Sequence, residues 1–376
     1  MSYKAQLADI REQIDKIDSE YLQLFSRRME LSREVAKIKG ENNLAILDEG
    51  REQQIVNRVA DLVDPSLRGE AALLMRATLA LSRGQQRNLL FHNEAPLLPP
   101  PRLHKNADLK CAYQGVAGAW SEQAARRFFP DAELLSSEYF EDVFDAVKNG
   151  SADYGVVPIE NSRTGAIGET YDLLRKHGCY IVGRLWIDIK QCLLGNKDAT
   201  LDDIREVYSH PEGFKQCRKF LNHRAWEQVA CRNTAVAAEM AAKTGTKRIA
   251  AIGSRLAAEL NDLQILASDI TDDSGNRTSF VVISAEPEYT GSDNLISVMF
   301  STQHRSGALC ETLLPFMAQG INMTRIESRP TIGGKYRFFM ELEANILDAD
   351  TLSTLRQAAS ASEYFEIIGC YTQIGE

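Results

Sequence analysis

Cationic side chains near the start of the chain have the spacing of an anion-binding site. Arg28 stands where a hydrophobe is expected, in a row spaced alternately by three and four that otherwise consists of Leu7, Ile10, Ile14, Ile17, Tyr21, Leu24, Leu31, Val35 and Ile38. Lys39 follows Arg28 by eleven residues. That is about three helical turns and nearly the same azimuth, so both side chains can converge on one small anion. Unpaired cations facing a helical core are unfavourable without an anion, so the pattern predicts a site for a dianionic ligand.

More polar residues fall on predicted helix faces nearby. Asp48, Arg51 and Glu52 share one face at the start of a second helix, and Thr78 and Ser82 share a face of a third. All five are candidates to contact the same ligand.

Arg11 cannot join that site within one chain. It lies 17 residues before Arg28, so it is roughly 25 Å away along the helix axis and points about 100° off. If Arg11 serves an identical site, that site belongs to a partner chain. Taken singly, Arg11 or Lys39 is better explained as a solvated or snorkelling charge. The combination of Arg28, Lys39 and Arg51 is not explained in that way, because several cations face one helical core.

A second set of polar residues lies in loops of the middle of the chain. They stand at or near predicted helix starts, where free N–H groups can hold an anion: Ser121, Asn161, Ser162, Thr164, Ser209, Asn233, Thr234 and Ser254. Each alone is more simply an N-cap. The stretch "PIENSRTGAIGETYDLL", however, carries more polar groups and glycines than a cap needs, and "GNRTSF" and "YSHPEGF" add to it.

The elements that must position these residues begin with an all-α module at 1–92. Its period predicts helices from residue 3 to about 39, from about 48 to 62 and from 66 to about 91. A first helix of about 35 residues would be roughly 50 Å long, more than a module of this size can cover, so we expect a partner chain. Residues 93–108 contain four prolines and no period, which predicts an extended spacer.

Two further regions follow the spacer. Residues 109–286 repeat strand, polar loop and helix, the pattern of an α/β domain with a largely parallel sheet. Residues 293–376 read strand, helix, strand, hairpin, helix, strand, and this βαββαβ order is ferredoxin-like. There Gly307 starts a helix directly after a strand, and Glu327 and Ser328 end the next strand. A small amphoteric ligand suits that geometry, but a tight turn and a solvated carboxylate explain it as well.

Composition excludes several classes of partner. The chain has 376 residues and a net charge of -9, so no global basic field attracts nucleic acid or anionic lipid. Seven scattered cysteines without C-x-x-C spacing argue against a disulfide framework or a zinc site. No run of about 18 apolar residues and no apolar signal core is present. We expect a cytoplasmic protein with no metal or organic cofactor, and with small molecules or its own copies as partners.

The helical module resembles the all-helical chorismate mutase module, on the spacing of Arg11, Arg28, Lys39, Asp48, Arg51 and Glu52. The resemblance implies an intertwined dimer in which Arg11 crosses into the neighbouring site. It also implies that Arg28 and Arg11 clamp carboxylates, with Arg51 helping, and that Lys39 donates to the ether oxygen or a carboxylate. Glu52 and Asp48 would hold the substrate hydroxyl and neighbouring cations. A Claisen rearrangement needs only a folded dicarboxylate and stabilised charge at the ether, hence no nucleophile.

One position of this module departs from the family. A glutamine or glutamate late in the third helix commonly faces the ether oxygen, and our register puts Ser82 there. Gln85 or Gln86, from the next turn, is the alternative. Thr78, Ser82 and Gln86 are therefore the third-helix residues expected at the substrate.

The middle region resembles prephenate dehydratase. "YQGVAGAWSEQAA", "PIENSRTGAI", "YSHPEGFKQC" and "NRTSF" match its opening unit, central loop, Ser-His-Pro loop and Thr-Arg-Phe motif. The resemblance implies two lobes that close on the ligand like a periplasmic binding protein, with Thr278 donating to the departing hydroxyl. It implies a set of residues that bind carboxylates or the ketone: Ser121, Asn161, Ser162, Thr164, Ser209 and Gln216. His210 is an acid candidate, although a histidine before proline is more often structural.

This region also departs from its family at one position. Ser279 stands where arginine is usual. Arg277 shares its strand face and is the candidate substitute.

The last region resembles the ACT regulatory domain of prephenate dehydratases, on "RSGALCETL" and "RIESRP". The resemblance implies that L-phenylalanine binds between paired domains and inhibits the dehydratase. The expected contacts are Ser306, Gly307, Ala308, Leu309, Glu327, Ser328, Arg329 and Pro330. As a whole the chain resembles bifunctional chorismate mutase/prephenate dehydratases, which implies conversion of chorismate through prephenate to phenylpyruvate by a homodimer or a dimer of dimers.

Two other interpretations stay open. The chain would fit a ligand-sensing regulatory protein that has lost catalysis, or a mutase fused to an inactive dehydratase. The departures at Ser82 and Ser279 are what favours them.

Overall fold

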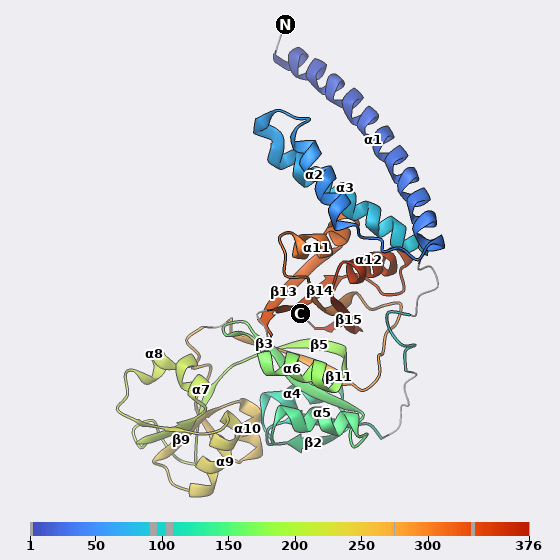
Figure 1. Ribbon diagram of the computed structural model, residues 1–376. Helices are drawn as coiled ribbons and strands as arrows, with labels where there is room; N and C mark the ends of the chain where they lie inside the picture. The colour runs from blue at the N-terminus through green and yellow to red at the C-terminus, as the bar shows by residue number, and fades with distance from the viewer. Residues whose placement is uncertain (1–2, 91–95, 103–107, 274, 332–334, 376) are drawn as a thin grey trace.

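The computed structural model describes residues 3–90, 96–102, 108–273, 275–331 and 335–375 (Figure 1). A helical module, two α/β lobes and a C-terminal α+β unit follow one another along the chain. The C-terminal unit lies between the helical module and the lobes (Figure 1). The predicted succession of fold classes, all-α, α/β and α+β, is confirmed.

The helical module consists of α1 (Tyr3–Glu41), α2 (Glu49–Ala60) and α3 (Arg68–Leu90), with a 3-10 turn η1 (Pro65–Leu67) before α3. Helix α2 begins where it does because the Asp48 side chain accepts a hydrogen bond from the Arg51 backbone N–H at 2.9 Å. Both α1 and α2 pack against α3. The helix bounds differ from the predicted ones by only a few residues.

Only one face of α1 is covered by other described residues of the chain. Its buried or half-buried positions in the second half are Phe25, Arg28, Met29, Ser32, Ala36 and Lys39. The apolar row identified from the sequence is exposed instead, with Leu24 67% and Leu31 54% exposed. Arg28 is the member of that row that turns toward α3. A long exposed apolar row needs another surface to cover it, as the expected partner chain would do.

The first lobe is a mixed sheet with three helices. Its strands are β1 (Lys110–Gln114), β2 (Glu133–Ser137), β3 (Tyr154–Asn161), β4 (Gly165–Ala166), β5 (Tyr180–Asp188) and β11 (Arg277–Ser284). Its helices are α4 (Trp120–Phe128), α5 (Phe140–Lys148) and α6 (Gly168–His177). Strands β1, β2 and β3 run parallel, whereas β11 runs antiparallel between β3 and β5.

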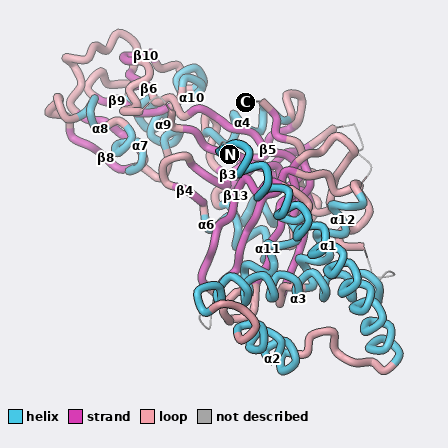
Figure 2. The backbone as a smooth tube through the Cα atoms, turned by 90° about the horizontal axis from the view of Figure 1, so that it is seen from above, coloured by secondary structure: helices cyan, strands magenta, loops and turns pink. Residues whose placement is uncertain are grey.

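The second lobe has the strands β6 (Cys192–Gly195), β7 (Glu206–Ser209), β8 (Glu227–Ala230), β9 (Ile249–Gly253) and β10 (Gln264–Ala267). Its helices are α7 (Pro211–Gln216), α8 (Arg218–Leu221), α9 (Thr234–Thr244) and α10 (Arg255–Leu260). Strands β7, β8 and β9 are parallel, and β6 is antiparallel to β9 and β10. In Figure 2 this lobe projects to one side, away from α2.

The prediction of a largely parallel sheet is wrong for β6, β11 and the short β4. The chain passes between the lobes after β5 and after β10, and β6 and β11 are the strands that follow these passages. Each enters its sheet without a crossover helix. Because β5 and β6, like β10 and β11, belong to different sheets, neither β6 nor β11 follows a strand of its own sheet through the crossover connection that makes neighbouring strands parallel.

The C-terminal unit has the strands β12 (Leu295–Ser301), β13 (Asn322–Pro330), β14 (Tyr336–Glu343), β15 (Tyr364–Tyr371) and β16 (Gln373–Ile374), with helices α11 (Ala308–Ala318) and α12 (Ala349–Ser360). The order β13-β14-β12-β15 is ferredoxin-like, as predicted. The hairpin turn at 332–334 lies outside the described residues.

Both neighbours are joined to the C-terminal unit. Strand β15 pairs with β5 of the first lobe at Gly369 and Ile181. A Cβ on Gly369 would lie 2.3 Å from the Ile181 carbonyl oxygen, so this approach of two backbones requires glycine. On the other side, α3 packs against α11 and α12.

The described part of the Pro-rich spacer, residues 96–102 and 108, contains no helix or strand. It does not stand free. Leu98 is buried among apolar residues of the C-terminal unit, and the Tyr289 hydroxyl donates to the Pro99 carbonyl at 3.1 Å. Residues 91–95 and 103–107 of the spacer lie outside the described residues.

The seven cysteines are free thiols, as expected. Among the helices in the described part of the chain, none is long and apolar enough to cross a membrane.

Candidate active sites

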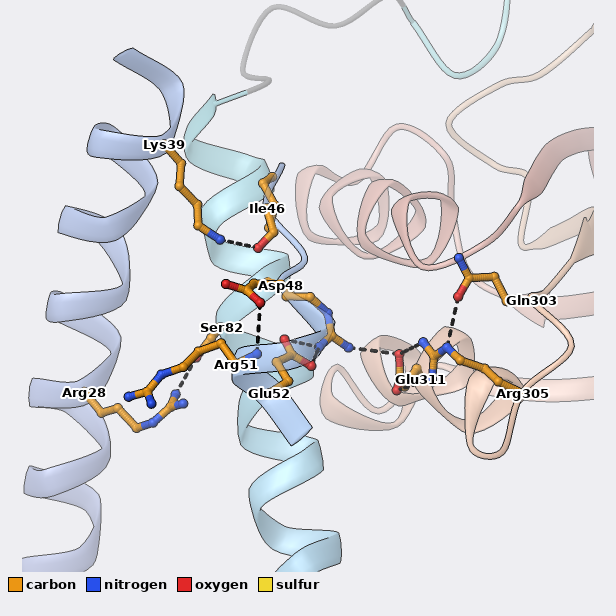
Figure 3. Close-up of polar contacts among 11 residues, drawn as sticks. Arg28, Lys39, Ile46, Asp48, Arg51, Glu52, Ser82, Gln303, Arg305 and Glu311 are labelled. Atoms are coloured by element: carbon orange, nitrogen blue, oxygen red, sulfur yellow. Dashed lines mark hydrogen bonds and ion pairs between the residues drawn. The ribbon is translucent and has the colours of Figure 1, made fainter. Parts of the chain in front are cut away.

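Polar side chains from all three N-terminal helices gather at one place in the helical module (Figure 3). Arg28 of α1 donates through Nη1 to the Ser82 hydroxyl of α3 at 2.5 Å. One turn further along α3, Gln86 Nε2 donates to the Ser32 hydroxyl at 3.0 Å. Lys39 Nζ donates to the Ile46 carbonyl at 2.5 Å, just before α2. The helix periodicity therefore brings Arg28, Ser82 and Gln86 to one interface.

The electrostatics of this site depend on a carboxylate from α2. Burial lowers the pKa of the Arg28 guanidinium, and the Glu52 carboxylate opposes that shift. Both oxygens of Glu52 accept hydrogen bonds from Arg83 Nη1. Gln86 is 8% exposed, and its Oε1 has no hydrogen-bond partner among the described residues. A buried amide that is only partly satisfied is what a ligand-binding position requires.

The other residues predicted for this site are placed less directly. Asp48 caps α2, and Arg51 is exposed. The Thr78 hydroxyl donates to the Leu74 carbonyl of its own helix at 2.8 Å. Arg11 is exposed, and because α1 is continuous from Tyr3 to Glu41, it lies roughly 25 Å from Arg28 along the helix axis. One chain therefore does not bring Arg11 to the site.

A cleft of about 340 Å³ lies between the two lobes. The polar residues that line it come from both lobes and from the passage between them: Gln114, Ser121, Asn161, Gln191, His210, Glu212, Gln216, Arg232, Asn233, Thr234 and Thr278. Four residues expected at a ligand thus line one cleft, namely Ser121, Asn161, Gln216 and Thr278.

Strand pairing places Thr278 against Asn161. The two residues are opposite each other on β11 and β3, and Asn161 Nδ2 donates to Thr278 Oγ1 at 3.0 Å. Asn161 is itself held in place, because its Oδ1 accepts from the backbone N–H groups of Arg163 and Thr164 at 3.0 and 3.2 Å. Since Thr278 Oγ1 accepts from Asn161, its own hydrogen is free to be donated into the cleft.

The second lobe contributes polar side chains at the ends of its helices. The Gln216 Oε1 accepts from Gln191 Nε2 at 3.1 Å, which leaves the Gln216 amide hydrogens available to the cleft. Asn233 caps α9 by accepting from the Val236 N–H at 2.7 Å. His210 caps α7, with Nδ1 accepting from the Glu212 N–H at 3.1 Å. Burial lowers the pKa of His210, so this histidine fits the structural alternative better than the acid.

Three residues expected at the ligand do not line the cleft. The exposed Ser162 hydroxyl donates to the Gly275 carbonyl at 3.1 Å and accepts from the Arg277 N–H at 2.9 Å. Thr164 is exposed in the turn capped by Asn161. Ser209 is fully buried, with no partner for its hydroxyl among the described residues.

Position 279 faces away from the cleft. Ser279 is fully buried, and its hydroxyl accepts from Arg184 Nε of the neighbouring strand β5 at 2.8 Å. A guanidinium is therefore present beside the position where the family has arginine, and it comes from Arg184. Arg277, the candidate substitute, instead pairs with Asp188 at 3.3 Å.

Sequence reasoning missed several cleft residues. Arg232 is the one Lys or Arg side chain among the described residues that line the cleft, and it forms an ion pair with Glu138 of the first lobe. Gln114 and Gln191 also line it. The only available signal was their place directly before a helix or a lobe passage. Within the described chain, no three His, Cys, Asp or Glu side chains gather in a metal-binding cluster.

The two segments expected to bind an effector lie at the same end of the C-terminal sheet. Ser301, Arg337 and Arg329 are in register across β12, β14 and β13. Residues 306–309 follow β12 and residues 327–330 belong to β13, so β14 lies between the two segments. Gly307 has φ of +82° directly before α11, and with Ala308 and Leu309 it lines a hollow of about 230 Å³. The second segment does not line that hollow. Its Arg329 instead pairs with Asp172 of the first lobe at 3.6 Å.

Comparisons with known proteins agree with this division of the chain. Residues 10–87 match the family model for chorismate mutase type II, and residues 111–288 match that for prephenate dehydratase. The bifunctional chorismate mutase/prephenate dehydratase of Escherichia coli K12 is 31% identical over 389 residues, covering 99% of this chain and 97% of the relative.

Two further relatives each match a large part of the chain. The chloroplastic arogenate dehydratase/prephenate dehydratase 2 of Arabidopsis thaliana is 35% identical, covering 74% of this chain and 78% of the relative. A solved structure of the prephenate dehydratase of Arthrobacter aurescens in complex with L-Phe is similar with a TM-score of 0.64 and 28% identity, covering 70% of this chain and 90% of that one.

Proposed function

Because the chain belongs to the family of bifunctional chorismate mutase/prephenate dehydratases, we propose that its two polar sites divide two consecutive reactions between them. The enzyme rearranges chorismate to prephenate and then converts prephenate to phenylpyruvate, and L-phenylalanine inhibits it. The observation that carries the division of labour is that one chain holds a cationic site among α1–α3 and a separate polar cleft between two lobes.

The helical site suits the rearrangement of chorismate. Arg28 and Lys39 supply positive charge for a dicarboxylate, and Ser82 sets the direction of the Arg28 guanidinium. Gln86, one turn from Ser82, is the buried amide that we assign to the ether oxygen, to which Nε2 can donate its second hydrogen while the first is held by Ser32. Glu52 accepts from the substrate hydroxyl, with Asp48 and Arg51 at the rim. The site accelerates the reaction by holding the folded conformer and stabilising charge at the breaking bond.

The cleft suits the loss of carbon dioxide and hydroxide from prephenate. When the carboxylate leaves as carbon dioxide, its bonding electrons complete the aromatic ring and expel the ring hydroxyl. Hydroxide is a poor leaving group, so a hydrogen bond donated to it lowers the barrier. Thr278 is assigned this role because Asn161 occupies the acceptor side of its hydroxyl. Gln216, Ser121 and the start of α9 are assigned to carboxylate and ketone.

The single chain does not complete the helical site, so we propose a homodimer or a dimer of dimers. In it, Arg11 of the partner subunit would reach the Arg28 site, and the exposed apolar row of α1 would be covered. Phenylalanine would bind at residues 306–309 of one C-terminal unit and 327–330 of another, as their separation within one chain suggests. We propose a cytoplasmic location, which the free cysteines suit.

A coupled assay tests the function. Purified full-length protein should remove the absorbance of chorismate and then form phenylpyruvate, and added L-phenylalanine should slow the second step. Binding of chorismate or phenylalanine without turnover would favour the ligand-sensing interpretation instead. Turnover that stops at prephenate would favour a mutase with an inactive dehydratase.

A further inference from the structure

A chain of four charged side chains connects the helical site with the C-terminal unit (Figure 3). It starts at Glu52, whose carboxylate is held by Arg83 Nη1. The other arm of the same guanidinium, Nη2, donates to Glu311 Oε2 at 2.9 Å. Arg305 completes the chain by binding both oxygens of Glu311 at 3.0 and 2.7 Å. We call these four residues the Arg83 chain.

Because Arg83 is buried in the middle of the Arg83 chain, its charge must be paired with carboxylates. The Arg83 side chain is 8% exposed, and a guanidinium cannot lose its charge. It therefore needs carboxylates, and it has one on each side, from α2 and from α11. Contacts with Arg305 and Arg83 lower the pKa of Glu311 although burial opposes them, so this carboxylate is ionised near neutral pH. Two cations and two anions thus balance across the junction of the two modules.

The position of Arg83 on α3 connects the Arg83 chain to the mutase reaction. Arg83 directly follows Ser82, which is the partner of Arg28, so α3 presents Ser82 to one arginine and Arg83 to the acid of the same site. A carboxylate offers about four lone-pair positions. The contacts with a single Arg83 nitrogen therefore leave Glu52 able to accept from a ligand hydroxyl, in an orientation set by Arg83.

We propose that Arg83 is a positioning residue for the mutase reaction, held in place by Glu311 of the C-terminal unit, and that it orients Glu52 toward the substrate hydroxyl. The C-terminal unit is thereby part of the structural support of a site about 260 residues earlier in the chain. Without Glu311, Arg83 has only Glu52 as an anionic partner among the described residues and draws that carboxylate away from the substrate. This inference rests on the proposed role of Glu52.

The test is Glu311→Gln in the full-length protein, with mutase and dehydratase kinetics measured on the same preparation. Loss of one charged hydrogen-bond partner predicts a fall of about tenfold in mutase kcat, with a smaller change in KM for chorismate, because the hydroxyl contact orients the reacting conformer. Dehydratase kcat with prephenate stays unchanged.

Ser360→Ala is the matched control. The Ser360 hydroxyl accepts from Arg87 at 2.9 Å, so this variant removes another contact between α3 and the C-terminal unit. We expect normal mutase kinetics from it. An equal loss of mutase activity in Ser360→Ala and Glu311→Gln would overturn the proposal, because docking of the two modules would then matter and the Arg83 chain would not.

A double-mutant comparison separates this inference from the proposed function. Glu52→Gln should greatly reduce mutase kcat, and adding Glu311→Gln should lower it no further, since both act through Glu52. If Glu52→Gln is fully active, the assignment of Glu52 fails and the inference fails with it. If Glu52→Gln is impaired while Glu311→Gln alone behaves as wild type, the site assignment stands and only the inference is overturned.

Discussion

In the helical module Arg28 and Ser82 project from within long continuous helices, whereas in the two lobes the site residues stand at or near the ends of strands and helices. Arg28 and Ser82 meet because two long helices pack side by side. Thr278 and Asn161 meet because β11 returns from the second lobe and pairs with β3. The first site is thus a product of helix periodicity, and the second a product of strand register.

The two sites also differ in what one chain completes. The cleft has polar groups from both lobes and from the passage between them within one chain. The helical site lacks Arg11, and α1 leaves an apolar row exposed beside it. In the proposed account the cleft functions as a unit of one chain, while the helical site depends on its neighbours, namely a partner chain and the C-terminal unit. Each prediction below tests one side of this contrast.

The largest effect is expected from Thr278→Ala. Removing the donor to a poor leaving group should lower dehydratase kcat by about 10² to 10⁴-fold. The mutase should be unaffected, so prephenate should accumulate from chorismate and can be quantified by chromatography. Thr278→Ser, which keeps the hydroxyl, is the control. Loss of both activities in Thr278→Ala would mean that the sites are not separate.

Arg28→Ala should lower mutase kcat by about 10²-fold or more, the scale of losing a preorganised charge at the transition state. Arg28→Lys should fail as well, because an ammonium cannot reproduce the fork of a guanidinium. Dehydratase activity on added prephenate reports whether the fold is intact. Near-normal mutase rates in either variant would remove Arg28 from the site.

Mixing two inactive chains tests the dependence on a partner. In a re-equilibrated equimolar mixture of Arg11→Ala and Arg28→Ala chains, heterodimers carry one site with both defects and one with neither, so about a quarter of all sites should be intact. Mutase activity should rise accordingly from near zero. A mixture that exchanges subunits and remains inactive would show that Arg11 does not act across the dimer.

A smaller effect is expected in the cleft from Arg232→Ala. Arg232 is the one Lys or Arg among the described residues lining the cleft, and its ion pair with Glu138 bridges the lobes. Loss of a charge-assisted contact to a substrate carboxylate predicts a rise of about tenfold in KM for prephenate with little change in kcat. Glu138→Gln, which breaks the ion pair but keeps the cation, is the matched control. Equal effects from both variants would assign Arg232 to lobe closure alone.

The helical site was the more predictable of the two, for a physical reason. Helix periodicity relates residues of one helix directly, so the placement of Arg28 and Lys39 on one side of α1 follows from spacing, whereas the role of Glu52, on another helix, was expected through the family resemblance. Arg83 was invisible to the same reasoning, because its partners Glu52 and Glu311 lie 31 and 228 residues away and only tertiary packing unites them.

The cleft was predicted mainly through family motifs. Spacing alone does not reveal that Asn161 and Thr278 are opposite each other, because their register depends on how the chain returns from the second lobe. The motif "PIENSRTGAI" also shows what a family motif cannot predict, namely which of its side chains face the cleft. Its Asn161 points to the cleft, while Ser162 bonds to Gly275 and Arg277 outside it. Arg184 could not be predicted to lie beside Ser279, since it comes from a neighbouring strand.

The most direct test of two separate sites in one chain uses the two single-site variants together. Arg28→Ala alone should form no phenylpyruvate from chorismate, and Thr278→Ala alone should stop at prephenate. An equimolar mixture of the two, analysed for products by chromatography, should convert chorismate to phenylpyruvate, because prephenate released by one variant is a substrate for the other. A mixture that yields no phenylpyruvate, under conditions in which the wild-type protein does, would contradict the account.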